Sequence, residues 1–109
     1  MVFLQQITKE QLQDGNYLLF IFSPFCGTCH VARAMLEKIE SIHQQTIFFE
    51  MNASYYADYL QEHKVESVPC LLIMEQGEVK EKVYAFRSIG NIYTYLYEYK
   101  PEIFQEKMQ

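Results

Sequence analysis

The sequence is short of several residue types, and some of these shortages exclude a class of protein. Its 109 residues include no tryptophan, only three cysteines, and nine lysine and arginine residues against 14 aspartate and glutamate residues. The nine basic residues are scattered and the net charge is −5, whereas binding to nucleic acid needs a concentrated basic surface. We therefore expect no nucleic-acid partner.

Long apolar runs are also missing. No stretch approaches the roughly 20 apolar residues that cross a bilayer, and residues 1–11 lack the basic start and apolar run of a signal peptide. We expect a cytoplasmic protein with no membrane partner, and an odd number of cysteines in a reducing compartment argues against a disulfide framework. Because 50% of its residues are apolar, the chain is long enough for one domain with a true core, residues 1–109, and too short for two ordinary ones.

Four short segments have the composition of β-strands. Three are continuous apolar runs, as expected of strands covered on both faces, and the fourth alternates as a half-exposed strand does. They are residues 17–23, 46–51, 70–75 and 79–86. A hairpin turn centred on Gly77 is expected between the last two.

Helical patterns flank these strands, so the sheet should have a parallel portion, to which the closing hairpin adds antiparallel edges. Helices are expected after a capping box formed by Thr8 and Gln11, from Cys26 to Ile42, over residues 55–64, and over residues 89–103 with a kink or restart at Pro101.

The helix that begins near Cys26 is amphipathic: Ile42 falls on its apolar side, and Arg33 and Glu40 fall on the charged side. A cysteine between a buried strand and a helix lies against unpaired backbone amides and the positive end of the helix dipole, which favours the thiolate. Cysteines so placed have pKa values of about 3.5 to 7.5, against about 8.5 for a free thiol. Cys29, one turn later, should lie deeper and attack a mixed disulfide formed at Cys26.

Three further residues accompany the cysteine pair. Pro69 stands directly before a buried strand, where a cis peptide bond after Val68 would leave the Val68 backbone free to pair with an extended substrate. His30 is either a solvated residue of the first helical turn or a cation that favours a neighbouring thiolate. Cys70 is either a small core residue or a third redox or metal-binding thiol.

Together, "FCGTC" at a strand-to-helix junction, "VPC" with its proline 40 residues after Cys29, and "EQGEV" one strand later resemble the thioredoxin family over nearly the whole chain. The resemblance implies an α/β thioredoxin fold, with a central mixed sheet of four to five strands flanked by helices. It implies that Cys26 is the nucleophile, that Cys29 is the resolving thiol and that Pro69 is the cis-proline of a substrate groove. The groove would also include Phe25, Gly27, Thr28 and Val68.

The chain departs from the usual family pattern at several positions. Typical thioredoxins have Trp-Cys-Gly-Pro-Cys-Lys, whereas this chain has Phe25, Thr28 and His30 at the differing places. The buried acid that the family carries six positions before the first cysteine is here Phe20. That acid helps to move the proton of the resolving thiol, so its loss implies slower reduction or another base. Glu50 falls where a family lysine often pairs with the acid.

The leading hypothesis is a thiol-disulfide oxidoreductase, of the protein-disulfide reductase kind, that works in electron transport and cell redox homeostasis. It would act on disulfide-containing proteins or small thiols, take electrons from an external reductant such as a thioredoxin reductase, and need neither cofactor nor metal. We expect it to be a monomer. Two alternatives stay open: a metal or iron–sulfur site at Cys26, Cys29 and Cys70, and a non-catalytic thioredoxin-like module that holds a partner.

Overall fold

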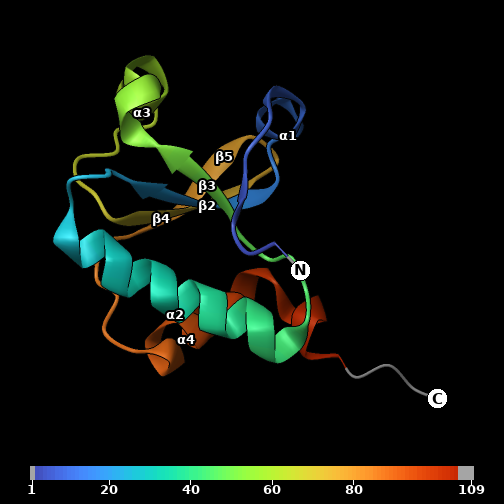
Figure 1. Ribbon diagram of the computed structural model, residues 1–109. Helices are drawn as coiled ribbons and strands as arrows, with labels where there is room; N and C mark the ends of the chain where they lie inside the picture. The colour runs from blue at the N-terminus through green and yellow to red at the C-terminus, as the bar shows by residue number, and fades with distance from the viewer. Residues whose placement is uncertain (1, 106–109) are drawn as a thin grey trace.

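The computed structural model describes residues 2–105 and consists of a five-stranded sheet with helices on both faces (Figure 1). The strands are β1 (Gln5–Gln6), β2 (Tyr17–Phe22), β3 (Phe49–Asn52), β4 (Cys70–Glu75) and β5 (Glu78–Val83). Their order across the sheet is β1-β3-β2-β4-β5. β3 runs parallel to β1 and β2, whereas β4 is antiparallel to β2 and β5. The predicted mixed α/β sheet is confirmed.

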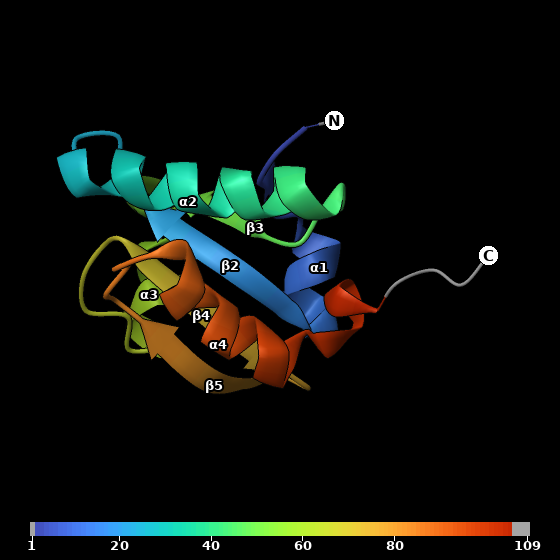
Figure 2. The same cartoon turned by 90° about the horizontal axis from the view of Figure 1, so that it is seen from below.

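The helices divide between the two faces of the sheet. They are α1 (Lys9–Asp14), α2 (Gly27–His43), α3 (Ala57–Glu62) and α4 (Ile89–Tyr99), with short 3-10 segments η1 (Ala53–Tyr55) and η2 (Pro101–Phe104). α2 and α4 cover one face, and α1 and α3 lie on the other (Figures 1 and 2). No helix within residues 2–105 has the length and apolar composition needed to cross a membrane.

β2 is buried on both faces, as its continuous apolar run predicts. Leu18 and Phe20 belong to the hydrophobic cluster on the side of α2 and α4. Leu19 and Ile21 point the other way and belong to the cluster on the side of α1 and α3. Because successive side chains of a strand alternate between faces, this one strand joins both halves of the core.

Local sequence signals set several element boundaries. Thr8 and Gln11 form the predicted capping box at the start of α1. Gln76 and Gly77, with φ values of 52° and 78°, form the turn between β4 and β5, which is the backbone that a two-residue hairpin turn requires. Pro101 begins η2 after α4 has ended. The predictions of the capping box, the hairpin and the break at Pro101 are confirmed.

Several elements differ from the prediction. The predicted order lacks β1, whose two residues are exposed glutamines with no strand pattern and are ordered by pairing with β3. The predicted helix over residues 55–64 is η1 followed by the shorter α3, and the last strand ends at Val83 rather than at residue 86. Ile42, predicted to be buried, is 55% exposed because it lies in the last turn of α2, beyond the core contacts.

Glu40 is the clearest correction on α2. The charge pattern predicts that this side chain faces solvent, but it is fully buried, one turn after the core residue Leu36. Its Oε1 accepts a hydrogen bond from the Leu4 amide at 2.8 Å, and its Oε2 accepts bonds from the Ile47 and Phe48 amides, also at 2.8 Å. These bonds also explain why β3 starts later than predicted, since amides of the segment before it donate to Glu40.

Candidate active site

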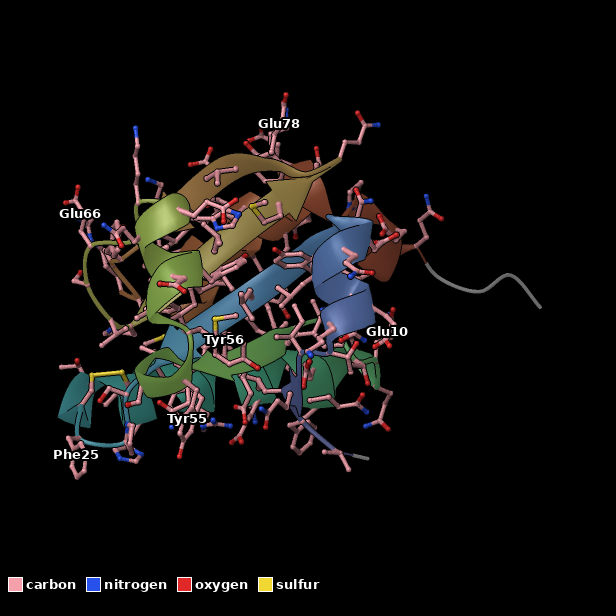
Figure 3. All side chains as sticks on the ribbon, turned by 90° about the horizontal axis from the view of Figure 1, so that it is seen from above. Glu10, Phe25, Tyr55, Tyr56, Glu66 and Glu78 are labelled. Carbon is pink, nitrogen blue, oxygen red and sulfur yellow. A yellow bond between two sulfur atoms is a disulfide. The ribbon has the colours of Figure 1, made fainter. Side chains whose placement is uncertain are left out.

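Cys26 and Cys29 lie at the N-terminal end of α2, where Figure 3 draws a disulfide close to the labelled Phe25. The two cysteines form this disulfide with their Cα atoms 5.3 Å apart, within the usual range for a disulfide. Cys26 is the N-cap of α2, and its Sγ accepts a hydrogen bond from the Cys29 amide at 3.2 Å. The Oγ1 of Thr28 lies 3.4 Å from the same sulfur. A backbone amide and the positive end of a helix both favour a thiolate at Cys26 when the pair is reduced.

The two sulfurs differ in their access to solvent. Cys29 is 3% exposed and belongs to the core cluster on the α2 side, whereas Cys26 only packs against the edge of that cluster. Gly27 and Thr28 are exposed, and the Phe25 ring is 94% exposed (Figure 3). One cysteine is thus presented at the surface, and the other lies behind it, as the sequence predicts.

The loop before β4 meets this helix start. The peptide bond between Val68 and Pro69 is cis, as the sequence leads us to expect. Pro69 and Thr28 line one groove of about 350 Å³, together with Val31, Ala32, Tyr84 and Phe86. The groove therefore combines the first turns of α2, the cis-proline and the segment after β5. Sequence reasoning missed Tyr84 and Phe86, because their alternating pattern reads as the end of a strand.

Cys70 lies away from the cysteine pair. It is a free thiol, fully buried at the start of β4, in the cluster on the side of α1 and α3, whereas Cys29 lies in the cluster on the opposite face. Within residues 2–105, no group of three or more His, Cys, Asp or Glu side chains is placed to hold a metal ion. The geometry thus gives no support to a metal or iron–sulfur site at the three cysteines.

We expect the Cys70 thiol to be inert in the folded protein. Burial raises its pKa to about 12, against the opposing effect of Lys82, so the thiol stays protonated until the pH approaches that value. After reduction of the protein, iodoacetamide at pH 8 should modify Cys70 at least about 100-fold more slowly than Cys26, as measured by peptide mass spectrometry. Labelling in urea should remove the difference; equal labelling rates in the folded protein would contradict the prediction.

The position of the missing family acid is filled by a buried ring. Phe20 is fully buried and pairs in register with Glu50 of β3. Arg33 of α2 donates a hydrogen bond to the Oε1 of Glu50, and its guanidinium carbon lies 5.2 Å from the centre of the Phe22 ring and 5.9 Å from that of Phe20. Burial raises the pKa of Glu50, and Arg33 opposes the rise. The partner of Glu50 is therefore Arg33, a cation on α2 that the charge pattern assigned to the solvent-facing side of the helix.

Arg33 also borders a second cavity beside the cysteine pair. This cavity, of about 210 Å³, is lined by Cys29, His30 and Arg33 together with Phe22, Ser23 and Pro24. His30 itself is exposed, so it stands at the rim, on the side of Cys29. His30 and Arg33 thus line the same cavity as the inner cysteine.

A mixed sheet, a Cys-x-x-Cys disulfide at a helix start and an adjacent cis-proline together define a thiol-disulfide oxidoreductase of the thioredoxin type. A family model described as Thioredoxin matches residues 2–98. The chain belongs to the thioredoxin family.

Individual relatives agree with this assignment. The chain is 36% identical over 95 residues to the thioredoxin-like protein YusE of Bacillus subtilis, covering 87% of this chain and 86% of that protein. It is 27% identical over 71 residues to Thioredoxin-1 of Saccharomyces cerevisiae, covering 65% of this chain and 69% of that protein.

Solved structures show the same fold. The thioredoxin of Malassezia sympodialis has a TM-score of 0.73 at 15% identity, over 88% of this chain and 90% of that one. A thioredoxin mutant from Halobacterium salinarum has a TM-score of 0.71 at 17% identity, over 99% of this chain and 93% of that one.

Proposed function

We propose that this protein is a protein-disulfide reductase in which Cys26 is the nucleophile and Cys29 the resolving thiol. The observation that carries this proposal is the position of Cys26 as the N-cap of α2, with the Cys29 amide donating to its Sγ at 3.2 Å. That amide stabilises negative charge on the Cys26 sulfur, and the thiolate is the nucleophile in disulfide exchange.

The chemistry proceeds in two exchanges. The Cys26 thiolate attacks one sulfur of a substrate disulfide, and the other substrate sulfur leaves as a thiolate, so a mixed disulfide forms. The Cys29 thiolate then attacks the Cys26 sulfur, closes the intramolecular disulfide and releases the second substrate sulfur as a thiolate. Two electrons pass from the cysteine pair to the substrate, and an external reductant such as a thioredoxin reductase returns them.

The substrate contacts form a surface around Cys26. We assign this role to Phe25, Gly27, Thr28, Val68 and Pro69. Support comes from the exposure of the Phe25 ring, at 94%, and from the groove that Thr28 and Pro69 line with two aromatic residues. In this proposal the Val68 backbone pairs with an extended segment of a disulfide-containing protein, while smaller disulfides need only reach the Cys26 sulfur.

Two further residues have secondary roles in the proposal. His30 tunes the reaction as a cation near the pair when it is protonated. Cys70 contributes core packing rather than redox chemistry, which its burial on the opposite face of the sheet supports.

We place the protein in the cytoplasm, as a single-domain monomer over residues 1–109 that serves electron transport and redox homeostasis. A reducing compartment suits a chain that keeps a buried free thiol at Cys70.

The function is tested by reduction of insulin. Catalytic amounts of the full chain should accelerate insulin precipitation by dithiothreitol at least about tenfold over dithiothreitol alone, and the same protein alkylated after reduction should not. No acceleration would overturn the proposal and favour a non-catalytic binding module. Stoichiometric metal, with visible absorption in protein purified without oxygen, would overturn it in favour of a metal or iron–sulfur centre.

A further inference from the structure

The resolving step of the proposed reaction needs a proton acceptor. Cys29 must lose its proton before its sulfur attacks Cys26, and it is only 3% exposed. The Cys29 amide at the helix start donates a hydrogen bond to the Cys26 sulfur. The described residues form no comparable hydrogen bond to the sulfur of Cys29. Burial disfavours a thiolate unless a neighbouring group compensates.

The cavity beside Cys29 leads toward such a group. Its volume of about 210 Å³ is enough to hold water, and it borders both Cys29 and Arg33. Because the two residues are four apart on α2, they lie on the same side of the helix, one turn from each other. Arg33 in turn donates to the Oε1 of Glu50. Glu50 does not itself line the cavity, so Arg33 is the residue that links the space beside the inner thiol to a carboxylate on the sheet.

Glu50 is free to take a proton, whereas the other carboxylate beneath α2 is not. Both oxygens of Glu40 accept backbone amides, and that side chain is fully buried. Glu50 uses its Oε1 for Arg33, while its Oε2 accepts no hydrogen bond from residues 2–105. Its side chain is 21% exposed, so it is shielded without being sealed from solvent.

The surroundings of Glu50 bring its proton affinity closer to that of a thiol. Burial raises its pKa, and the negative charges of Glu37 and Glu40 on α2 add to the rise. Arg33 opposes the rise both as a cation and as a hydrogen-bond donor. The remaining titratable side chain at this cavity is His30, at its rim. Proton transfer is most efficient when the acceptor's affinity approaches that of the donor.

We propose that Glu50 accepts the proton of Cys29 through the solvent of this cavity and that Arg33 is the residue that positions it. The inference rests on the proposed function. The S–H bond of Cys29 breaks and its proton passes by way of water to the Glu50 carboxylate. The Cys29 thiolate then bonds to the Cys26 sulfur, and the substrate sulfur leaves with the electron pair of the broken bond. Glu50 finally returns its proton to solvent. A carboxylate on β3 thus takes the role of the family acid, whose position on β2 is occupied here by Phe20.

The two exchanges can be timed separately. Reduced full chain is mixed in a stopped-flow instrument with one equivalent of dithiobis(nitrobenzoate): the first release of coloured thiolate reports attack by Cys26, and the second reports resolution by Cys29. We expect Glu50→Gln to change the first rate less than twofold and to slow the second at least about tenfold. Glu50→Asp, which keeps a carboxylate, should have a second rate between that of the parent protein and that of Glu50→Gln. The matched control is Glu37→Gln, which removes another carboxylate beside Arg33, 3.9 Å away, but leaves the Glu50 carboxylate in place; it should change neither rate more than about twofold.

A pH profile separates proton transfer from a structural effect. In the parent protein the second rate should fall at low pH as Glu50 becomes protonated, and Glu50→Gln should lack this acid limb. Arg33→Gln should move the limb to higher pH, because it removes the cation that opposes protonation of Glu50.

Each outcome has a distinct meaning. An unchanged second rate in Glu50→Gln, or a slower one with an unchanged pH profile, overturns the inference and leaves the proposed function standing. If the parent protein shows no rapid first release, the proposed function itself fails at Cys26. Thermal melts of each variant identify any that do not fold. If Glu50→Gln does not fold, the second rate of Glu50→Asp is compared with that of the parent protein instead.

Discussion

Cys29→Ser should accumulate mixed disulfides with its substrates, and Cys26→Ser should accumulate none. The reason is the difference in access: Cys26 lies at the exposed start of α2, whereas Cys29 is 3% exposed behind it. Without Cys29 the first exchange still occurs but the mixed disulfide is not resolved. Both variants should lower insulin turnover more than about 100-fold, because a hydroxyl does not replace a thiolate nucleophile.

The trapped species are measured on non-reducing gels and by mass spectrometry of the linked peptides. With insulin as substrate, the link should join an insulin cysteine to Cys26. Cys70→Ala is the matched control, since Cys70 is the third cysteine and is buried on the other face of the sheet; in the parent background it should keep full turnover. Equal trapping by the two serine variants, or linkage through Cys70, would remove the assigned roles.

The parts of this site that could be predicted from the sequence are those encoded by short segments. The Cys26–Cys29 pair, the helix that starts there and the cis-proline at Pro69 each depend on neighbouring residues, and their meaning depends on an order of elements that apolar runs reveal. The groove could be predicted only in part. Tyr84 and Phe86 join it because β5 ends at Val83 and the segment that follows lies beside the first turns of α2, and no local signal fixes that direction.

The features that sequence analysis missed depend on contacts distant along the chain. β1 exists through its pairing with β3. Arg33 is charged and lies on a helix, which favours solvent exposure, yet the rings of Phe20 and Phe22 and the carboxylate of Glu50 hold it partly under α2. Helical periodicity assigns a side chain to a face, but only the tertiary structure shows whether a charged residue finds partners there.

Glu40→Ala should cost about 3 kcal/mol or more of unfolding free energy, because it leaves three buried backbone amides without an acceptor. The Glu40 side chain is fully buried and accepts hydrogen bonds from Leu4, Ile47 and Phe48. Bonds to a charged acceptor contribute more than neutral ones, and a buried donor left unpaired carries its full desolvation cost. Urea unfolding of the full chain, followed by circular dichroism, measures the loss.

Glu40→Gln distinguishes the acceptor role from simple packing. Glutamine has nearly the same shape, but one end of its amide donates, so at least one of the three backbone amides faces another donor. We expect a loss of about 2 kcal/mol for this variant. Glu37→Ala, on the same helix and with a side chain that is 40% exposed, should change stability by less than about 1 kcal/mol. A loss of that smaller size for Glu40→Ala would contradict the prediction.

The same substitution has a local readout. The Leu4 amide belongs to the segment that leads into β1, and the Ile47 and Phe48 amides precede β3. If Glu40 fixes both segments to α2, hydrogen exchange at these three amides should accelerate in Glu40→Gln more than at the central amides of β2. Uniform acceleration across the sheet would mean that the carboxylate stabilises the fold as a whole without anchoring its parallel edge.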